Sequence, residues 1–124
     1  MRIMTVDDSK ATRQFIRGAV DVLGFEFLEA GDGKEGLEVL EKEKGKVDLI
    51  LLDWLMPVMD GIEMLEALKS NDLFKDIPVT MVTSESEREN VVEALGKGAR
   101  NYLIKPFSQE DLIRTIMETL GIET

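Results

Sequence analysis

The sequence contains no cysteine and no histidine. Without cysteine there is no disulfide framework and no thiolate ligand for a metal. Without histidine the chain lacks the usual general base and the commonest zinc ligand. Any chemistry that it carries must therefore rest on aspartate, glutamate, lysine, threonine and serine.

Positive charge and long apolar runs are also scarce. The 15 lysines and arginines stand against 25 aspartates and glutamates, and the resulting net charge of −10 would repel a nucleic-acid backbone. No stretch approaches the roughly 20 apolar residues of a membrane-spanning helix. The N-terminal MRIMTVDD lacks the apolar region of a secretory signal. We therefore expect a cytoplasmic protein that binds neither nucleic acid nor membrane.

The 124 residues suffice for one domain with a substantial core. Along the chain, short apolar runs alternate with longer amphipathic stretches. Strands are predicted at 3–6, 25–29, 47–52, 77–82 and 101–104. Helices are predicted from the cap Ser9 to Gly24, around Leu37 and Leu40, at 61–70, at 87–97 and after the cap Ser108. Because strands separated by helices run parallel, this alternation indicates a doubly wound α/β fold with a five-stranded parallel sheet.

Residues that can carry chemistry follow four of the predicted strands. Ligands of open parallel sheets bind outside the carboxyl ends of the strands. The residues at these ends are Asp7 and Asp8, then Asp53, then Thr83 and Ser84, and finally Lys105. Taken singly, each has an ordinary explanation as a helix cap, a solvated strand end or part of a turn. Because all of them meet at one edge of the sheet, we expect a functional site there.

Carboxylates gathered at one edge repel one another and call for a cation. Oxygen ligands without histidine or cysteine suit a hard ion, preferably Mg²⁺. Mg²⁺ in turn suggests phosphoryl chemistry on an aspartate. The ion, the Lys105 ammonium and the Thr83 hydroxyl could then each bind one phosphoryl oxygen.

The motifs at these positions resemble those of the receiver domain of two-component response regulators, and most of all its single-domain chemotaxis members. The resemblance covers the whole chain and rests on Asp7-Asp8, Asp53-Trp54-Leu55-Met56-Pro57-Val58-Met59-Asp60-Gly61, Met81-Val82-Thr83-Ser84 and Lys105-Pro106-Phe107. It implies a flavodoxin-like (βα)5 fold with strand order 2-1-3-4-5. It also implies that residues 1–124 form a single receiver domain, without an output domain, that acts as a monomer.

The same resemblance implies the metal site and the reacting group. Asp53 would be the phosphoacceptor, and Asp7, Asp8, Asp53 and the backbone carbonyl of Leu55 would hold Mg²⁺. A histidine kinase would donate the phosphoryl group. The chain would be a signalling switch and not an enzyme, with self-catalysed phosphotransfer and autodephosphorylation as its only chemistry.

Further residues are implied to bind the phosphoryl group and to transmit its presence. Thr83 and Lys105 would bind phosphoryl oxygens, and the peptide bond before Pro106 would be cis. Thr83 would move toward the phosphoryl group, and Tyr102 would turn inward as the switch aromatic. A target, possibly the flagellar motor switch, would bind the face formed by the fourth helix, fifth strand and fifth helix.

Two positions would tune hydrolysis of the phosphorylated aspartate. Leu55 lies two residues after Asp53, and Glu85 lies two residues after Thr83. In the family these positions flank the path of the hydrolytic water, and some chemotaxis members carry a polar residue at the first. Leucine there departs from that pattern, and we expect it to hinder water and lengthen the lifetime of the phosphorylated state.

Alternative functions would need other outputs or other residues at this edge. Flagellar motor control is the favoured output, and a phosphorelay intermediate or a regulator of another partner is the alternative. A Mg²⁺-dependent phosphatase of the haloacid dehalogenase type would need a second aspartate where Leu55 stands. An FMN-binding protein would need a phosphate-cradling loop where Asp7-Asp8 stands, and a receiver kept only for protein binding would not need the complete residue set.

Overall fold

Strands and helices alternate strictly over residues 1–84 and 90–122, which the computed structural model describes. The strands are β1 (Arg2–Val6), β2 (Glu26–Ala30), β3 (Leu49–Asp53), β4 (Val79–Ser84) and β5 (Asn101–Lys105). The helices are α1 (Lys10–Val22), α2 (Gly33–Lys42), α3 (Gly61–Lys69), α4 (Val91–Gly96) and α5 (Gln109–Leu120). The predicted α/β alternation is confirmed. In these residues no helix has both the length and the apolarity that crossing a membrane requires.

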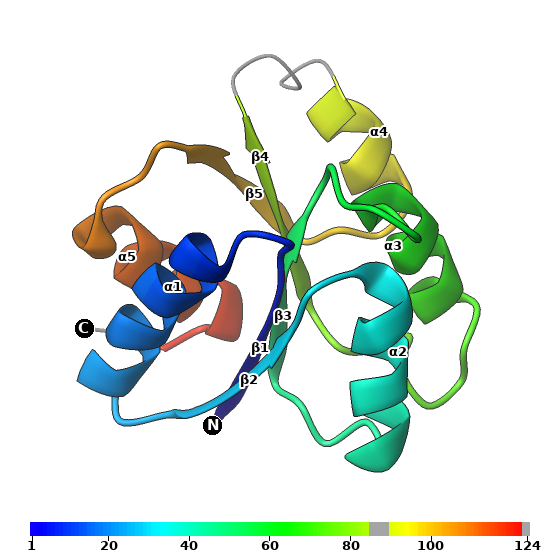
Figure 1. The fold of residues 1–124 in the computed structure, drawn as a ribbon, viewed down its shortest axis with the longest axis horizontal. Coiled ribbons are helices and arrows are strands. Elements are labelled where there is room, and N and C mark those ends of the chain that lie inside the picture. The colour runs from blue at the N-terminus through cyan, green and yellow to red at the C-terminus, as the bar shows by residue number, and fades with distance from the viewer. Residues whose placement is uncertain (85–89, 123–124) are drawn as a thin grey trace.

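All neighbouring strands of the sheet are parallel, in the order β2-β1-β3-β4-β5. Helices α1 and α5 cover one face, and α2, α3 and α4 cover the other (Figure 1). Side chains of β3 alternate between the two cores: Leu49 and Leu51 pack with α1 and α5, whereas Ile50 and Leu52 pack with α2 and α3. The predicted doubly wound fold and strand order are therefore confirmed.

The first and last helices begin at the predicted caps. The Ser9 hydroxyl accepts a hydrogen bond from the Thr12 amide, and the Ser108 hydroxyl accepts one from the Asp111 amide. Each satisfies an amide that the first turn of a helix leaves without an intrahelical partner. Because these caps lie just after β1 and β5, they also fix the direction of the chain where it leaves the carboxyl edge of the sheet.

Two strands begin two residues later than predicted, and they end one and two residues later, at Asp53 and Ser84. Strand β3 begins at Leu49 because the Val47 amide bonds back to Gly45. Strand β4 begins at Val79 because Pro78 has no amide proton to donate. The other strands and α3 differ from their predicted ends by a residue, and the predicted start of the fourth helix, 87–89, lies outside the described residues. Asp53 and Thr83 are consequently paired strand residues.

Candidate functional site

Three carboxylates meet at the carboxyl edge of the sheet. Asp7 and Asp8 directly follow β1, and Asp53 is the last residue of the neighbouring strand β3. One carboxylate oxygen from each lies within 4.8 Å of the others. Asp7 and Asp53 are buried, whereas Asp8 is exposed, so the cluster opens to solvent on one side. An all-oxygen donor set of this spacing fits a hard divalent cation such as Mg²⁺.

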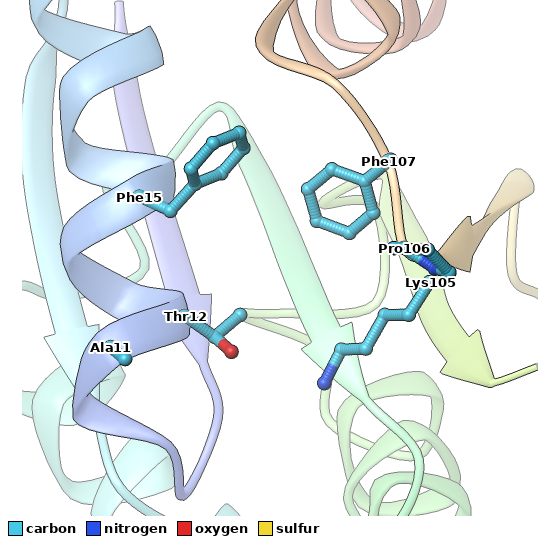
Figure 2. A pocket seen from close by; sticks show the side chains of 6 residues that line it. All are labelled: Ala11, Thr12, Phe15, Lys105, Pro106 and Phe107. Carbon is cyan, nitrogen blue, oxygen red and sulfur yellow. The ribbon is translucent and has the colours of Figure 1, made fainter.

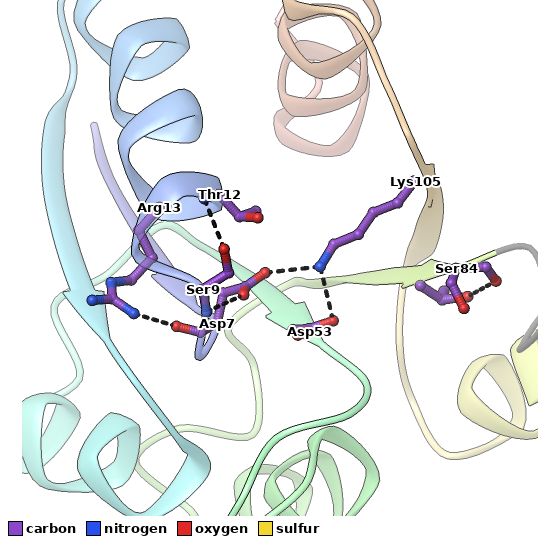
Figure 3. A network of polar contacts seen from close by, with 8 residues as sticks. Asp7, Ser9, Thr12, Arg13, Asp53, Ser84 and Lys105 are labelled. Atoms are coloured by element: carbon purple, nitrogen blue, oxygen red, sulfur yellow. Dashed lines mark hydrogen bonds and ion pairs between the residues drawn. The ribbon is translucent and has the colours of Figure 1, made fainter.

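The Lys105 ammonium joins two of these carboxylates. Its Nζ lies 3.1 Å from Asp7 Oδ2 and 3.3 Å from Asp53 Oδ1 (Figure 3). Lys105 ends β5, whose pairing with β4 places Lys105 opposite Ser84. A buried carboxylate without such compensation would be strongly disfavoured. The sheet thus explains how a carboxylate can end an otherwise apolar strand, because it brings the Lys105 ammonium to Asp53.

Burial is the main cause that raises the pKa of Asp53 from 3.8 to about 6. The charges of Asp7 and Asp8 act in the same direction, and the Lys105 ammonium opposes them. For Lys105, burial favours the neutral amine, but the charges of Asp53 and Asp7 prevail and raise its pKa. At neutral pH the site therefore contains an ionised Asp53 beside a protonated Lys105.

Thr83 and Tyr102 lie on the neighbouring strands β4 and β5. The buried Thr83 hydroxyl donates to the carbonyl of Ser84 at 2.9 Å, and Asp53 pairs in the sheet with Val82, one residue before Thr83. Tyr102 is 41% exposed. In this conformation Thr83 is bonded to the main chain of its own strand, and Tyr102 faces outward.

The predicted cis peptide bond before Pro106 is confirmed. The Leu55 side chain is 61% exposed in the loop that follows β3, and Glu85 lies outside the described residues. Beside Lys105 a largely apolar pocket of about 320 Å³ opens between α1 and the chain after β5 (Figure 2). It is lined by Ala11, Thr12, Phe15, Lys105, Pro106 and Phe107.

Sequence reasoning gave no role at this edge to two residues that shape it. Arg13 of α1 donates to the main-chain carbonyl of Asp7 at 2.6 Å. Gly61, the first residue of α3, donates from its amide to the Trp54 carbonyl at 2.8 Å and leaves no room for a side chain against Asp53. An arginine one helical turn after the cap Ser9, and a glycine that opens a helix, were the available signals.

Comparison with known proteins places this geometry in a family. Residues 3–117 match the family model described as "Response regulator receiver domain". The chain is 35% identical to chemotaxis protein CheY1 of Helicobacter pylori over 98% of each chain. It is 38% identical to the phosphate regulon transcriptional regulatory protein PhoB of Pseudomonas aeruginosa, over 95% of this chain and 51% of that protein. The chain thus spans about half of PhoB.

Solved structures agree with these relatives. Chemotaxis response regulator CheY4 of Vibrio cholerae superimposes with a TM-score of 0.87 at 34% identity, over 96% of this chain and 98% of that one. The receiver domain of the Francisella response regulator 1452 gives a TM-score of 0.85 at 32% identity, over 97% and 96%. The acidic edge, the facing lysine and the sheet order are thus found in a chain that belongs to the response regulator receiver domain family.

Proposed function

We propose that this chain is a phosphorylation-dependent signalling switch in which Asp53 accepts a phosphoryl group from a histidine kinase. The observation that carries the proposal is the setting of Asp53. It is a buried carboxylate with a pKa of about 6, beside two further aspartates and 3.3 Å from the Lys105 ammonium. A carboxylate that is largely ionised at neutral pH can act as a nucleophile.

In the proposed reaction an Asp53 oxygen attacks the phosphorus atom of a phosphohistidine. The new O–P bond forms as the P–N bond breaks, and the departing imidazole keeps the electron pair. Asp7, Asp8, Asp53 and the Leu55 carbonyl would hold Mg²⁺, which neutralises charge on the phosphoryl oxygens when it is bound. Lys105, already 3.3 Å from Asp53, would bind one of those oxygens.

The switch would begin when the Thr83 hydroxyl changes its hydrogen-bond partner. Its hydroxyl bonds to the Ser84 carbonyl and would have to rotate to reach a group on Asp53. Tyr102, 41% exposed on β5, would then turn inward into the space that Thr83 leaves. The exposed Val92 and Leu95 of α4 lie on the same proposed target face, formed by α4, β5 and α5. The charge of the added phosphoryl group would thereby shift the equilibrium between two conformations of this face.

Chemotaxis, with the flagellar motor switch as target, is the output that we favour. Two relatives named as chemotaxis proteins, from Helicobacter pylori and Campylobacter jejuni, match over 98% of this chain and over 98% and 93% of their own lengths. A histidine kinase would be the donor. The phosphorylated protein should then bind a flagellar switch component more tightly than the unphosphorylated protein does, and equal binding of both forms would contradict this output.

The fluorescence of Trp54 provides a direct test of the phosphorylation site. Trp54 is the single tryptophan, is buried and directly follows Asp53. We expect its emission to change on addition of Mg²⁺, and to change again when acetyl phosphate is added. The second change should decay once the donor is exhausted, and mass spectrometry should find one added phosphoryl group.

Asp53→Asn is the matched control because it keeps the shape of the side chain and removes the nucleophile. The donor-dependent change and the added mass should both be absent in this variant. Absence of a Mg²⁺ response and of a phosphorylated mass in the unaltered protein would contradict the proposal, and would favour a receiver fold that serves protein binding alone.

Leu55→Asn should accelerate loss of the phosphoryl group by about fivefold, the equivalent of one hydrogen bond of about 1 kcal/mol to the attacking water. Leu55 is exposed and offers that water no partner. Val58→Asn is the control, because Val58 is exposed in the same loop and its φ of 67° suits asparagine. Decay of the phosphorylated mass measures both rates. An unchanged or slower decay in Leu55→Asn would show that Leu55 does not hinder hydrolysis.

A further inference from the structure

The guanidinium of Arg13 links three elements beside the acidic cluster. Arg13 lies in the first turns of α1, and its Nε forms an ion pair with Glu29 Oε1 of β2 at 2.7 Å. Its Nη1 donates to the carbonyl oxygen of Asp7, just after β1, at 2.6 Å (Figure 3). The Arg13 side chain is only 17% exposed. The cation is therefore held in one place by contacts on both sides.

Every polar atom of Asp7 forms a hydrogen bond. Its amide donates to the Ala30 carbonyl at 3.0 Å, and its Oδ1 accepts from the Ser9 amide at 2.8 Å. Its Oδ2 accepts from Lys105, and its carbonyl accepts from Arg13. The Arg13 guanidinium thus binds the main-chain carbonyl of Asp7. Because Arg13 binds the carbonyl, the lone pairs of the carboxylate remain for the Ser9 amide, Lys105 and a metal ion.

We propose that Arg13 is a positioning residue for the metal site, which rests on the function proposed above. Three carboxylates within 4.8 Å of one another repel, and the segment that carries Asp7 and Asp8 joins a strand to a helix. Arg13 opposes their separation because it ties this segment to Glu29 on the adjacent strand. The protein then binds the ion without first having to gather its ligands.

The chain offers a matched control at the opposite edge of the sheet. Arg2 at the start of β1 forms an ion pair with Glu26 of β2 at 3.1 Å and donates to the Lys46 carbonyl at 2.7 Å. Its side chain is 26% exposed. Arg2 therefore joins β1 to β2 with the same kinds of contact and has a second ion pair, with Glu43 at 3.0 Å, but it lies at the end of β1 away from the aspartates. A purely stabilising arginine should behave as Arg2 does.

Two measurements separate a positioning role at the metal site from a purely stabilising role. They are calorimetric titration with Mg²⁺ and urea unfolding in the absence of Mg²⁺. Both Arg13→Met and Arg2→Met should lower the urea midpoint. Arg13→Met loses one ion pair and a hydrogen bond to a carbonyl, and Arg2→Met loses two ion pairs and such a hydrogen bond. Arg13→Met alone should raise the Mg²⁺ dissociation constant, by about tenfold, as substitutions behind metal ligands do. Arg13→Lys should recover part of that loss. In labelling with acetyl phosphate, the Mg²⁺ concentration for half-maximal rate should rise for Arg13→Met by the same factor.

The outcomes distinguish this role from the proposed function. If the unaltered protein binds Mg²⁺ and Arg13→Met binds it equally well, Arg13 has no positioning role. Equal weakening by Arg2→Met would also overturn the proposal, because loss of stability alone would then explain the effect. If the unaltered protein binds no Mg²⁺ and gains no phosphoryl group, the proposed function itself is wrong.

Discussion

Asp53→Asn is expected to raise the free energy of unfolding of the metal-free protein at pH 8 by up to about 3 kcal/mol, at 1.36 kcal/mol for each unit of pKa shift. Burial is the main cause that raises the pKa of Asp53 from 3.8 to about 6, with Asp7 adding to it and Lys105 opposing it. The ionised carboxylate therefore destabilises the folded state without a metal ion. Asparagine removes that charge and keeps the shape.

The pH dependence follows from the sign of this shift. The folded state holds the Asp53 proton more tightly than the unfolded state, so the stability of the protein falls as the pH rises from about 4 to about 6. Above that range the loss is complete, and below it Asp53 is protonated in both states. The advantage of Asp53→Asn should accordingly grow from near zero at pH 4 to its full value above pH 7.

Urea unfolding from pH 4 to pH 8 in a chelator measures this difference. Asp72→Asn is the control, because the Asp72 side chain is 99% exposed and its ion pair with Lys75 at 3.3 Å is open to water. It should change stability little at any pH. Mg²⁺ should then stabilise the unaltered protein more than Asp53→Asn. An Asp53→Asn variant that is less stable than the unaltered protein at pH 8 without metal would show that Asp53 is not destabilising.

Gly61→Ala is expected to destabilise the protein by about 3 kcal/mol or more, the upper range for overpacking. An added Cβ would lie 2.2 Å from the Asp53 carbonyl oxygen and 3.0 Å from the Trp54 Cα. Both are backbone atoms, so no side-chain rotation can relieve the contact. Either the start of α3 or the end of β3 must move. The second movement would displace Asp53, so Mg²⁺ binding should weaken as well.

Gly18→Ala separates this contact from the general effect of a glycine in a helix. Gly18 lies within α1, and an added Cβ there would meet only Gln109 Nε2 at the ordinary distance of 3.7 Å. Alanine at such a position should stabilise the protein by about 0.5–1 kcal/mol. Urea midpoints of the two variants should therefore move in opposite directions. Equal midpoints for Gly61→Ala and the unaltered protein would exclude the backbone clash.

Much of the fold and of the site could be predicted from local signals. The caps Ser9 and Ser108 act on amides three residues away, so their effect is visible in a short window of sequence. The strict alternation of strands and helices requires parallel strands, and parallel strands bring their carboxyl ends to one edge. Asp7, Asp8, Asp53 and Lys105 could therefore be assigned to one place before any distance was known.

The contacts within that place depend on packing between distant segments. Arg13 reaches Asp7 and Glu29 because α1 lies against two strands, and Gly61 meets Asp53 because α3 starts against the end of β3. The partner of Thr83 is likewise a backbone atom beside it, which no residue pattern indicates. The sequence by itself determined the order of elements and the edge where the aspartates and lysine gather, because both follow from periodicity and chain direction. Only the tertiary structure decided which atoms touch, because a contact of 3 Å depends on the register and packing of the whole sheet.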